Sequence, residues 1–165
     1  MILQGRVALV TGAARRVGQV IALALAKHKA HVVISYRTSR HDAEETVARL
    51  LRFGVRAEAI RADVANARDV QALVKHIARR FGRLDVLVNN AAVFARTPFA
   101  TLTERDWDVH LDTNLKGPFL CSLFASRLMR KTGGKIINIA DWAGKRPYRD
   151  YLPYCVSKAG VIALT

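Results

Sequence analysis

Short stretches of consecutive apolar residues alternate along this chain with stretches in which apolar residues recur every three or four positions. The continuous stretches are rich in Val, Ile and Leu, which is typical of strands covered on both faces. They predict strands at Arg6–Thr11, His31–Tyr36, Arg56–Ala62, Leu84–Asn89 and Lys135–Ala140. The periodic stretches predict helices at Val17–Lys27, Asp42–Arg52, Asn66–Phe81, Thr103–Arg130 and from Tyr151 onward.

The regular alternation of strand and helix predicts an α/β fold. A strand that returns to the same sheet through a helix makes a right-handed parallel crossover, and helices then cover both faces of the sheet. We therefore expect a doubly wound, Rossmann-like parallel sheet of five strands. The chain has 165 residues, of which 51% are apolar, and this is enough for one core. We expect one domain over residues 1–165.

Local signals mark several helix ends. Thr103-Glu-Arg-Asp106 is a candidate capping box, and Gly54 and Gly82 follow predicted helices. The last helical pattern, by contrast, is still apolar where the sequence stops at Thr165. This helix has no capping residue, and the predicted strand before it would lie at the open edge of the sheet. Both signals predict that the domain is incomplete and lacks its C-terminal strands.

Composition excludes several classes of protein. No apolar stretch is long enough to span a membrane and no secretory signal is visible, so we expect a cytoplasmic protein. Cys121 and Cys155 lie in predicted helices and are expected to be reduced and buried, and the five histidines show no metal-ligand spacing. The formal charge of +14 is scattered rather than gathered in an aromatic-interleaved stripe. We expect neither nucleic acid nor a membrane as partner.

The turn after the first predicted strand is a candidate dinucleotide site. It reads Thr11-Gly-Ala-Ala-Arg-Arg-Val-Gly18 and leads from a strand into a helix. Small residues let the backbone approach a pyrophosphate, which the N–H groups and dipole of the helix N-terminus stabilise. The same glycines would also serve a tight turn without a ligand, so this turn alone leaves both interpretations open.

The end of the second predicted strand indicates which dinucleotide would bind. An acidic residue there would bind the ribose 2′-hydroxyl of NAD and repel a 2′-phosphate. The segment instead reads Ser35-Tyr36-Arg37-Thr38-Ser39. Arg37 can form paired hydrogen bonds with a phosphate, and Ser39 can donate its hydroxyl. Because Arg15 or Arg16 can add a further cation from the first turn, the expected cofactor is NADPH.

Tyr154 and Lys158 are four residues apart, so on a helix they share one face. A tyrosine with a pKa of about 10 is a poor acid at neutral pH, and a neighbouring cation stabilises its phenolate. The pair is therefore a candidate for general acid catalysis. The spacing is common in proteins, and only its context makes it informative.

Five motifs in this order resemble the short-chain dehydrogenase/reductase family over the whole chain: Thr11-Gly12 with Gly18, Asp63-Val64, Asn89-Asn90-Ala91-Ala92, Asn114, and Tyr154 with Lys158. The resemblance implies that Asp63 and Val64 hold the adenine and that Asn89 to Ala91 line the adenosine side. It implies that Asn114 anchors a proton-relay water. Tyr154 would be the acid, and Lys158 would bind the nicotinamide ribose and lower the tyrosine pKa. Members of the family usually continue for two further strands and their helices.

Three departures from the usual family pattern resemble the pteridine reductase and dihydromonapterin reductase branch. Arg16 occupies the middle glycine position of the turn, Ala92 ends the Asn-Asn-Ala motif, and Asp141 stands thirteen residues before Tyr154 where most members have serine. The resemblance also implies that Phe94 sandwiches a pterin against the nicotinamide.

Asp141 changes the expected chemistry. A serine hydroxyl can donate a hydrogen bond to a substrate carbonyl, whereas an ionised aspartate can only accept one. An aspartate could hold the Tyr154 phenol and help to supply a proton to a ring nitrogen, which suits C=N reduction. Its charge would oppose phenolate formation and so oppose Lys158. A role as a loop-capping residue is the alternative.

We therefore expect an NADPH-dependent oxidoreductase that reduces a pteridine. A carbonyl reductase of the 3-oxoacyl-thioester or aldehyde/ketone kind is the alternative, and a non-catalytic dinucleotide-binding fragment is the alternative from another class. The expected catalytic residues are Asn114, Asp141, Tyr154 and Lys158, and the expected substrate contacts are Phe94, Asp141 and Tyr154. The expected cofactor contacts are Thr11, Gly12, Arg15, Arg16, Val17, Gly18, Tyr36, Arg37, Ser39, Asp63, Val64, Asn89, Asn90, Ala91, Tyr154 and Lys158.

Assembly is the last expectation. Leu111, Leu115, Phe119 and Leu123 recur at intervals of four in a predicted helix, as on a helix face that packs against a partner. Helices in this part of the family pair across a twofold axis. We expect the complete protein to be a homodimer or homotetramer.

Overall fold

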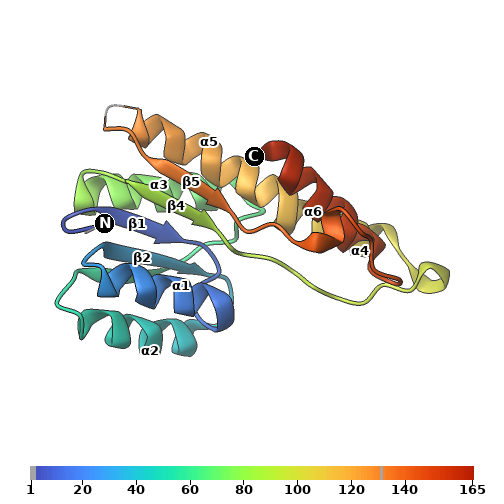
Figure 1. The fold of residues 1–165 in the computed structure, drawn as a ribbon, viewed down its shortest axis with the longest axis horizontal. Coiled ribbons are helices and arrows are strands. Elements are labelled where there is room, and N and C mark those ends of the chain that lie inside the picture. Colours follow the sequence, from blue (N-terminus) through green and yellow to red (C-terminus); the bar gives the residue numbers. More distant parts are fainter. Residues whose placement is uncertain (1–2, 131) are drawn as a thin grey trace.

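A computed structural model describes residues 3–130 and 132–165. Its centre is a sheet of five parallel strands in the order β3-β2-β1-β4-β5 (Figure 1). The strands are β1 (Val7–Val10), β2 (His31–Tyr36), β3 (Ala57–Arg61), β4 (Val86–Asn89) and β5 (Lys135–Asn138). The predicted α/β fold with a doubly wound parallel sheet is confirmed. The order reverses at β1, between β2 and β4, and such a reversal opens a crevice at the carboxyl ends of the strands.

Helices cover both faces of the sheet (Figure 1). The helices are α1 (Arg16–Lys27), α2 (Arg40–Leu51), α3 (Ala67–Phe81), α4 (Glu104–Leu111), α5 (Gly117–Met129) and α6 (Leu152–Leu164). One core cluster joins the sheet to α1 and α2 through residues such as Val10, Ala22 and Leu50. A second joins the opposite face to α3 and α5 through Leu87, Leu73 and Leu120. The strands are apolar on both sides because each side has its own helical layer.

Capping follows the sequence signals. Thr103 accepts a hydrogen bond from the Asp106 N–H, and the Asp106 carboxylate accepts one from the Thr103 N–H, so the predicted capping box is confirmed. Gly82 ends α3 with φ of 74°, in the left-handed region that glycine enters without strain. Cys121 and Cys155 are buried and unpaired, as expected.

The prediction of one helix over Thr103–Arg130 is wrong. The segment contains α4, a π-helical turn at Asp112–Lys116, and α5. Pro118 has no N–H to donate to the Asn114 carbonyl, the bond that an α-helix requires at this position. The Gly117 N–H donates to the Asp112 carbonyl, five residues earlier, as in a π-helix. This turn contains one residue more than an α-helical turn, and Asn114 lies within it.

The edge strand β5 is only partly covered among the described residues. Ile136 and Ile137 are 38% and 47% exposed. None of the described helices is long and apolar enough to cross a bilayer.

Candidate functional site

A cleft of about 340 Å³ lies at the carboxyl ends of β1, β2 and β4, where the strand order reverses. Most of the predicted cofactor residues line it. They are Gly12, Arg15, Arg16, Val17, Gly18, Tyr36, Arg37, Ser39, Asp63, Val64, Asn90 and Ala91. Residues from four separate segments of the sequence thus meet around one hollow, as expected for a dinucleotide site in a doubly wound sheet.

Thr11, Asn89, Tyr154 and Lys158 were also predicted to contact the cofactor, but none of them lines the cleft. The Thr11 hydroxyl accepts hydrogen bonds from the N–H groups of Asn90 and Ala91, at 3.0 and 3.1 Å. The Asn89 amide nitrogen donates to Asn138 Oδ1 at 2.8 Å on the neighbouring strand. Both side chains are buried and hold the walls of the cleft in place.

At two glycines of the first turn, the backbone lies in close contact with neighbouring segments of the cleft wall. Gly12 has φ of 62°, and a Cβ there would lie 2.7 Å from Ala91 Cα. A Cβ on Gly18 would lie 2.5 Å from the Asn90 amide nitrogen and 2.8 Å from Ala13 Cα. Both positions therefore require glycine. The turn at Gly12 and the loop after β4 form one packed wall.

The cleft is built for anionic groups. The helix α1 begins at Arg16 with no side-chain cap and no acidic residue in its first turn, so its first N–H groups remain available to a phosphate. Ser39 precedes α2 and makes no cap hydrogen bond with its side chain. Arg37 is half-exposed, and its Nη1 lies 3.9 Å from Asp63 Oδ2. These donors fit a pyrophosphate at α1 and a 2′-phosphate at Arg37 and Ser39.

Arg16 adopts an unusual backbone conformation, with φ of 55°. Non-glycine side chains rarely enter this left-handed region, because Cβ approaches the following carbonyl oxygen. The position is the one where the family pattern has glycine. Arg16 therefore keeps the turn that a glycine would make and adds a guanidinium to the cleft.

Tyr154 and Lys158 lie on one face of α6, and both are buried. The Lys158 ammonium lies 5.8 Å from the centre of the Tyr154 ring and donates to the Ile139 carbonyl at 2.6 Å. Burial lowers the pKa of Lys158, and the Asp141 carboxylate opposes that shift. The Tyr154 hydroxyl donates to Asp141 Oδ2 at 2.7 Å.

Asp141 follows β5 and faces Tyr154. Its other oxygen, Oδ1, accepts from the Ala143 N–H at 2.8 Å and from the Tyr148 hydroxyl at 3.2 Å. Burial raises the pKa of Asp141, but the hydrogen bonds from Ala143, Tyr154 and Tyr148 outweigh it, so the pKa lies below its usual value. Burial, and then the bond and charge of Asp141, raise the pKa of Tyr154. The carboxylate thus caps the following 3₁₀ turn and also holds the phenol.

Asn114 connects the cleft to α6. Its side chain accepts from the Val93 N–H at 2.7 Å, donates to the Val93 carbonyl at 2.9 Å, and donates to Ser157 Oγ at 3.1 Å. Ser157 in turn donates to the Tyr154 carbonyl at 2.6 Å. Val93 lines the cleft, and these bonds link it to the backbone of Tyr154. They therefore fix the position of Tyr154 relative to the cleft.

Phe94 follows Val93 and is 59% exposed. Its ring stacks on Tyr151, with centroids 4.6 Å apart and an angle of 10° between planes, and meets Tyr154 edge-on at 4.7 Å. One side of Phe94 is therefore already occupied by Tyr151. Phe94 also lies next to the Tyr154 ring and directly follows Val93, which lines the cleft.

Several residues of this site were missed from the sequence. Ser35, whose hydroxyl lies 3.4 Å from the Gly12 N–H, and Ser157 are small polar residues with no motif of their own. Tyr148 and Tyr151 stand shortly before Tyr154, and that cluster of aromatic residues was a visible signal. Among the described residues, no group of three His, Cys, Asp or Glu side chains could hold a metal ion.

The sequence model of a family described as "short chain dehydrogenase" matches residues 6–165. A 3-oxoacyl-(acyl-carrier-protein) reductase of Synechocystis sp. is 43% identical over 164 residues, which cover 99% of this chain and 66% of that protein. The structure of a short chain dehydrogenase from Burkholderia cenocepacia in complex with NADP superposes with a TM-score of 0.94 at 37% identity, covering 100% of this chain and 67% of that one. An NAD⁺-bound xylitol dehydrogenase superposes with a TM-score of 0.95 at 32% identity, covering 100% and 64%. The chain therefore spans about two thirds of the length of these relatives.

Proposed function

Because the chain belongs to the short-chain dehydrogenase family, we propose that residues 1–165 are the single cofactor-binding domain of an NADPH-dependent reductase. One observation carries the proposal: Tyr154, with Asp141 and Lys158 beside it, is tied through Ser157 and Asn114 to Val93 in the wall of a cleft that suits a dinucleotide. A dinucleotide module without catalysis would need no buried Tyr-Lys pair.

The choice of NADPH rests on this chain's own residues. The fold accepts either cofactor, because one structural relative holds NADP and another holds NAD⁺. Here Tyr36 stands where an acid would select NAD, and Arg37 and Ser39 offer donors to a 2′-phosphate. Arg15, Arg16 and the N-terminus of α1 would hold the pyrophosphate.

The cofactor supplies a hydride when bound. Tyr154 donates the proton that the reduced substrate needs, and Lys158 holds the nicotinamide ribose. Asn114 fixes the position of α6 relative to the cleft. Asp141 orients the phenol by accepting its hydrogen bond. Burial and Asp141 raise the pKa of Tyr154, contrary to the lowering expected from Lys158. The phenol therefore keeps its proton at neutral pH but donates it less readily than an ordinary tyrosine.

The first candidate substrate is a carbonyl compound of the 3-oxoacyl-thioester kind. The reductase from Synechocystis sp. is named for that substrate, and its similarity extends over nearly the whole of this chain. In such a reduction the hydride goes to the carbonyl carbon and the Tyr154 proton to its oxygen. The relatives support this substrate better than a pteridine.

A pteridine remains the second candidate because of Asp141. The carboxylate takes the place of a hydroxyl that could donate to a carbonyl oxygen, and it binds the Tyr154 phenol instead. The exposed part of the Phe94 ring offers a surface on which a flat heterocycle could stack. Both features suit a ring C=N bond.

NADPH oxidation separates these possibilities. The chain is incubated with NADPH and a 3-oxoacyl thioester, with NADPH and an oxidised pterin, and with NADPH alone. We expect oxidation that requires a substrate, and the faster substrate assigns the class. Tight NADPH binding without turnover in any arm would leave a non-catalytic dinucleotide-binding module.

A further inference from the structure

Two loops meet beside Tyr154. One follows β4 and carries Phe94, and the other precedes α6 and ends at Tyr151, the residue before the helix of Tyr154. The two hydrogen-bonded side chains, Arg96 and Asp150, are 54 residues apart in sequence. Their contact therefore depends on the tertiary structure and not on local sequence.

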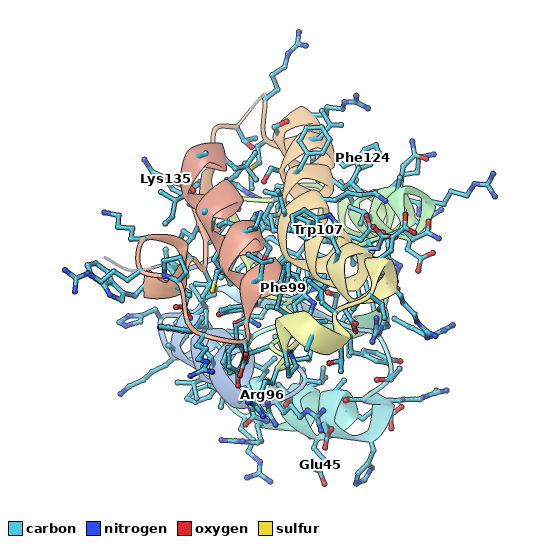
Figure 2. The ribbon with its side chains drawn as sticks, turned by 90° about the vertical axis from the view of Figure 1, so that its right-hand side faces the viewer. Glu45, Arg96, Phe99, Trp107, Phe124 and Lys135 are labelled. Carbon is cyan, nitrogen blue, oxygen red and sulfur yellow. The ribbon has the colours of Figure 1, made fainter. Side chains whose placement is uncertain are left out.

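Asp150 binds the first loop through its side chain and its backbone. Its Oδ2 accepts from Arg96 Nη2 at 2.6 Å, and its carbonyl accepts from the Thr97 N–H at 2.7 Å. Thr97 and Tyr151 form an isolated parallel bridge. Figure 2 shows Arg96 near the loop that leads into α6. We refer to these contacts of Arg96 and Thr97 with Asp150 and Tyr151 as the clasp.

Asp150 adopts an uncommon backbone conformation to make these contacts, with φ of 65°. A non-glycine residue in this region is strained and persists where its surroundings hold it there. The conformation turns the Asp150 carbonyl toward Thr97 and leaves the next residue, Tyr151, to stack on Phe94 at 4.6 Å. The clasp and the aromatic stack are thus adjacent along both loops.

The ion pair between Arg96 and Asp150 contributes little to the stability of the fold. Arg96 is 66% exposed at its side chain, and exposed ion pairs contribute little to folding. The first loop is also anchored from the other side, since Asn114 binds Val93 and His110 Nε2 lies 3.4 Å from the Ala95 N–H. The main effect of the clasp is to fix the position of Phe94 relative to Tyr151.

We propose that Arg96 and Asp150 are a positioning pair, which sets Phe94 against Tyr151 and Tyr154 and thereby shapes the substrate side of the site. Neither residue lines the cofactor cleft. Loss of the pair therefore affects substrate binding and leaves NADPH binding unchanged. The inference rests on the proposed function, because it places the substrate beside Phe94.

Four variants separate the ion pair from the backbone contact. Arg96→Ala removes the ion pair, and Arg96→Lys restores one charged hydrogen bond. Asp150→Gly removes the ion pair and keeps a residue suited to positive φ, whereas Asp150→Val removes the ion pair and disfavours that φ. The comparison of Asp150→Gly with Asp150→Val isolates the contribution of the backbone.

Kinetics with the substrate that the chain reduces give the first readout. We expect Arg96→Ala and Asp150→Gly to raise the substrate KM about two- to fivefold, the range for an exposed ion pair, with kcat and the NADPH Kd unchanged. Arg96→Lys should restore most of the loss. Asp150→Val should raise KM about tenfold or more, because it adds the cost of the backbone strain. High salt should raise the KM of the unmodified chain toward that of Arg96→Ala.

A second readout does not depend on activity. Contacts between the Phe94 and Tyr151 rings are measured by nuclear Overhauser effects, and protection of the Thr97 N–H by hydrogen exchange. Both should weaken in Asp150→Val and persist in Arg96→Lys. Ring contacts that survive in Asp150→Val, or a KM that stays unchanged when those contacts are lost, would overturn the proposal. If the unmodified chain reduces neither substrate, the proposed function fails, and the ring contacts still decide whether the clasp positions Phe94.

Discussion

Under the proposed function, Arg37 is the residue that would distinguish the two nicotinamide cofactors. Its guanidinium is half-exposed at the end of β2, with Ser39 beside it and no acid in the position that selects NAD. Replacing it with aspartate exchanges a phosphate ligand for a group that repels phosphate. We expect Arg37→Asp to weaken NADPH binding by about 1.5–3 kcal/mol, the range for hydrogen bonds to charged groups, and NADH binding less.

Fluorescence titration with both cofactors measures this change. Arg52→Asp is the matched control, because it makes the same charge reversal on an exposed arginine at the end of α2, outside the cleft. Equal losses of NADPH and NADH affinity in Arg37→Asp would show that this side chain does not bind the 2′-phosphate.

Asp141 accepts the hydrogen bond of the Tyr154 hydroxyl, and under the proposed function it affects how that proton is delivered. We expect Asp141→Ser to lower pterin reduction by about 10²–10⁴-fold, the range for a lost proton-transfer step, because the carboxylate that holds the Tyr154 phenol in the proposed proton-delivery pair is removed. Ketone reduction should hold or rise, because serine can donate to a carbonyl. Tyr154→Phe should impair ketone reduction severely and pterin reduction less. Pterin turnover that is intact in Asp141→Ser would leave the carbonyl substrate as the assignment.

The same substitution has a pH signature. Burial, and then Asp141, raise the pKa of Tyr154, so removing Asp141 lowers that pKa and leaves the effect of burial. Reduction needs the protonated phenol, and its rate falls as pH rises through the Tyr154 pKa. We expect the alkaline fall in ketone reduction to begin at a lower pH in Asp141→Ser than in the unmodified chain. Glu45→Ser, which removes an exposed carboxylate from α2, should leave the pH profile unchanged.

At the scale of elements, the 3₁₀ turn Trp142–Gly144 packs directly on α6. A Cβ at Gly144 would lie 2.8 Å from the backbone of Lys158 and Ala159, where no flexible side chain can move away. We expect Gly144→Ala to displace α6 from the turn, to destabilise the chain by about 1–3 kcal/mol and to lower kcat, because Tyr154 and Lys158 move with the helix.

Thermal unfolding and steady-state kinetics test this packing. Gly54→Ala is the control: Gly54 has φ of 72° but nothing within 4 Å of a built Cβ, so that substitution adds backbone strain without an overlap. It should destabilise the chain and leave kcat unchanged. Equal kcat in Gly144→Ala and the unmodified chain would mean that the turn does not position α6.

The order of the elements could be predicted from the sequence because continuous apolar stretches and helical periodicity are local. The break between α4 and α5 was missed, although Pro118 was visible, because the apolar periodicity continues across it. Most of the predicted cofactor residues line the cleft, because it is built from short runs of residues at strand ends. Phe94, Tyr151 and Asp150 meet only through tertiary structure, so no local pattern could place Phe94 against Tyr151 or reveal the clasp.

At the scale of the whole molecule, the exposed surface of α4 and α5 is the candidate interface between subunits. Leu115, one of the residues expected on the partner-facing surface, packs within the chain against Gly160 of α6. Phe119 is 47% exposed and Trp107 is 38% exposed, and Figure 2 shows Trp107 and Phe124 on the side of the molecule that carries these helices. Large exposed apolar side chains on adjacent helices are typical of a subunit interface.

We therefore expect this chain to associate through α4 and α5, with Phe119 near the centre of the contact. Light scattering at increasing concentration should give a mass above the 18.3 kDa of one chain. Phe119→Arg should return it to one chain, because a twofold axis places the new charge on both copies of the same surface. Leu51→Arg makes a similar change at a side chain that is 51% exposed on the opposite helical layer, and it should leave the association intact. A mass of one chain at every concentration, or association that withstands Phe119→Arg, would exclude this surface as the interface.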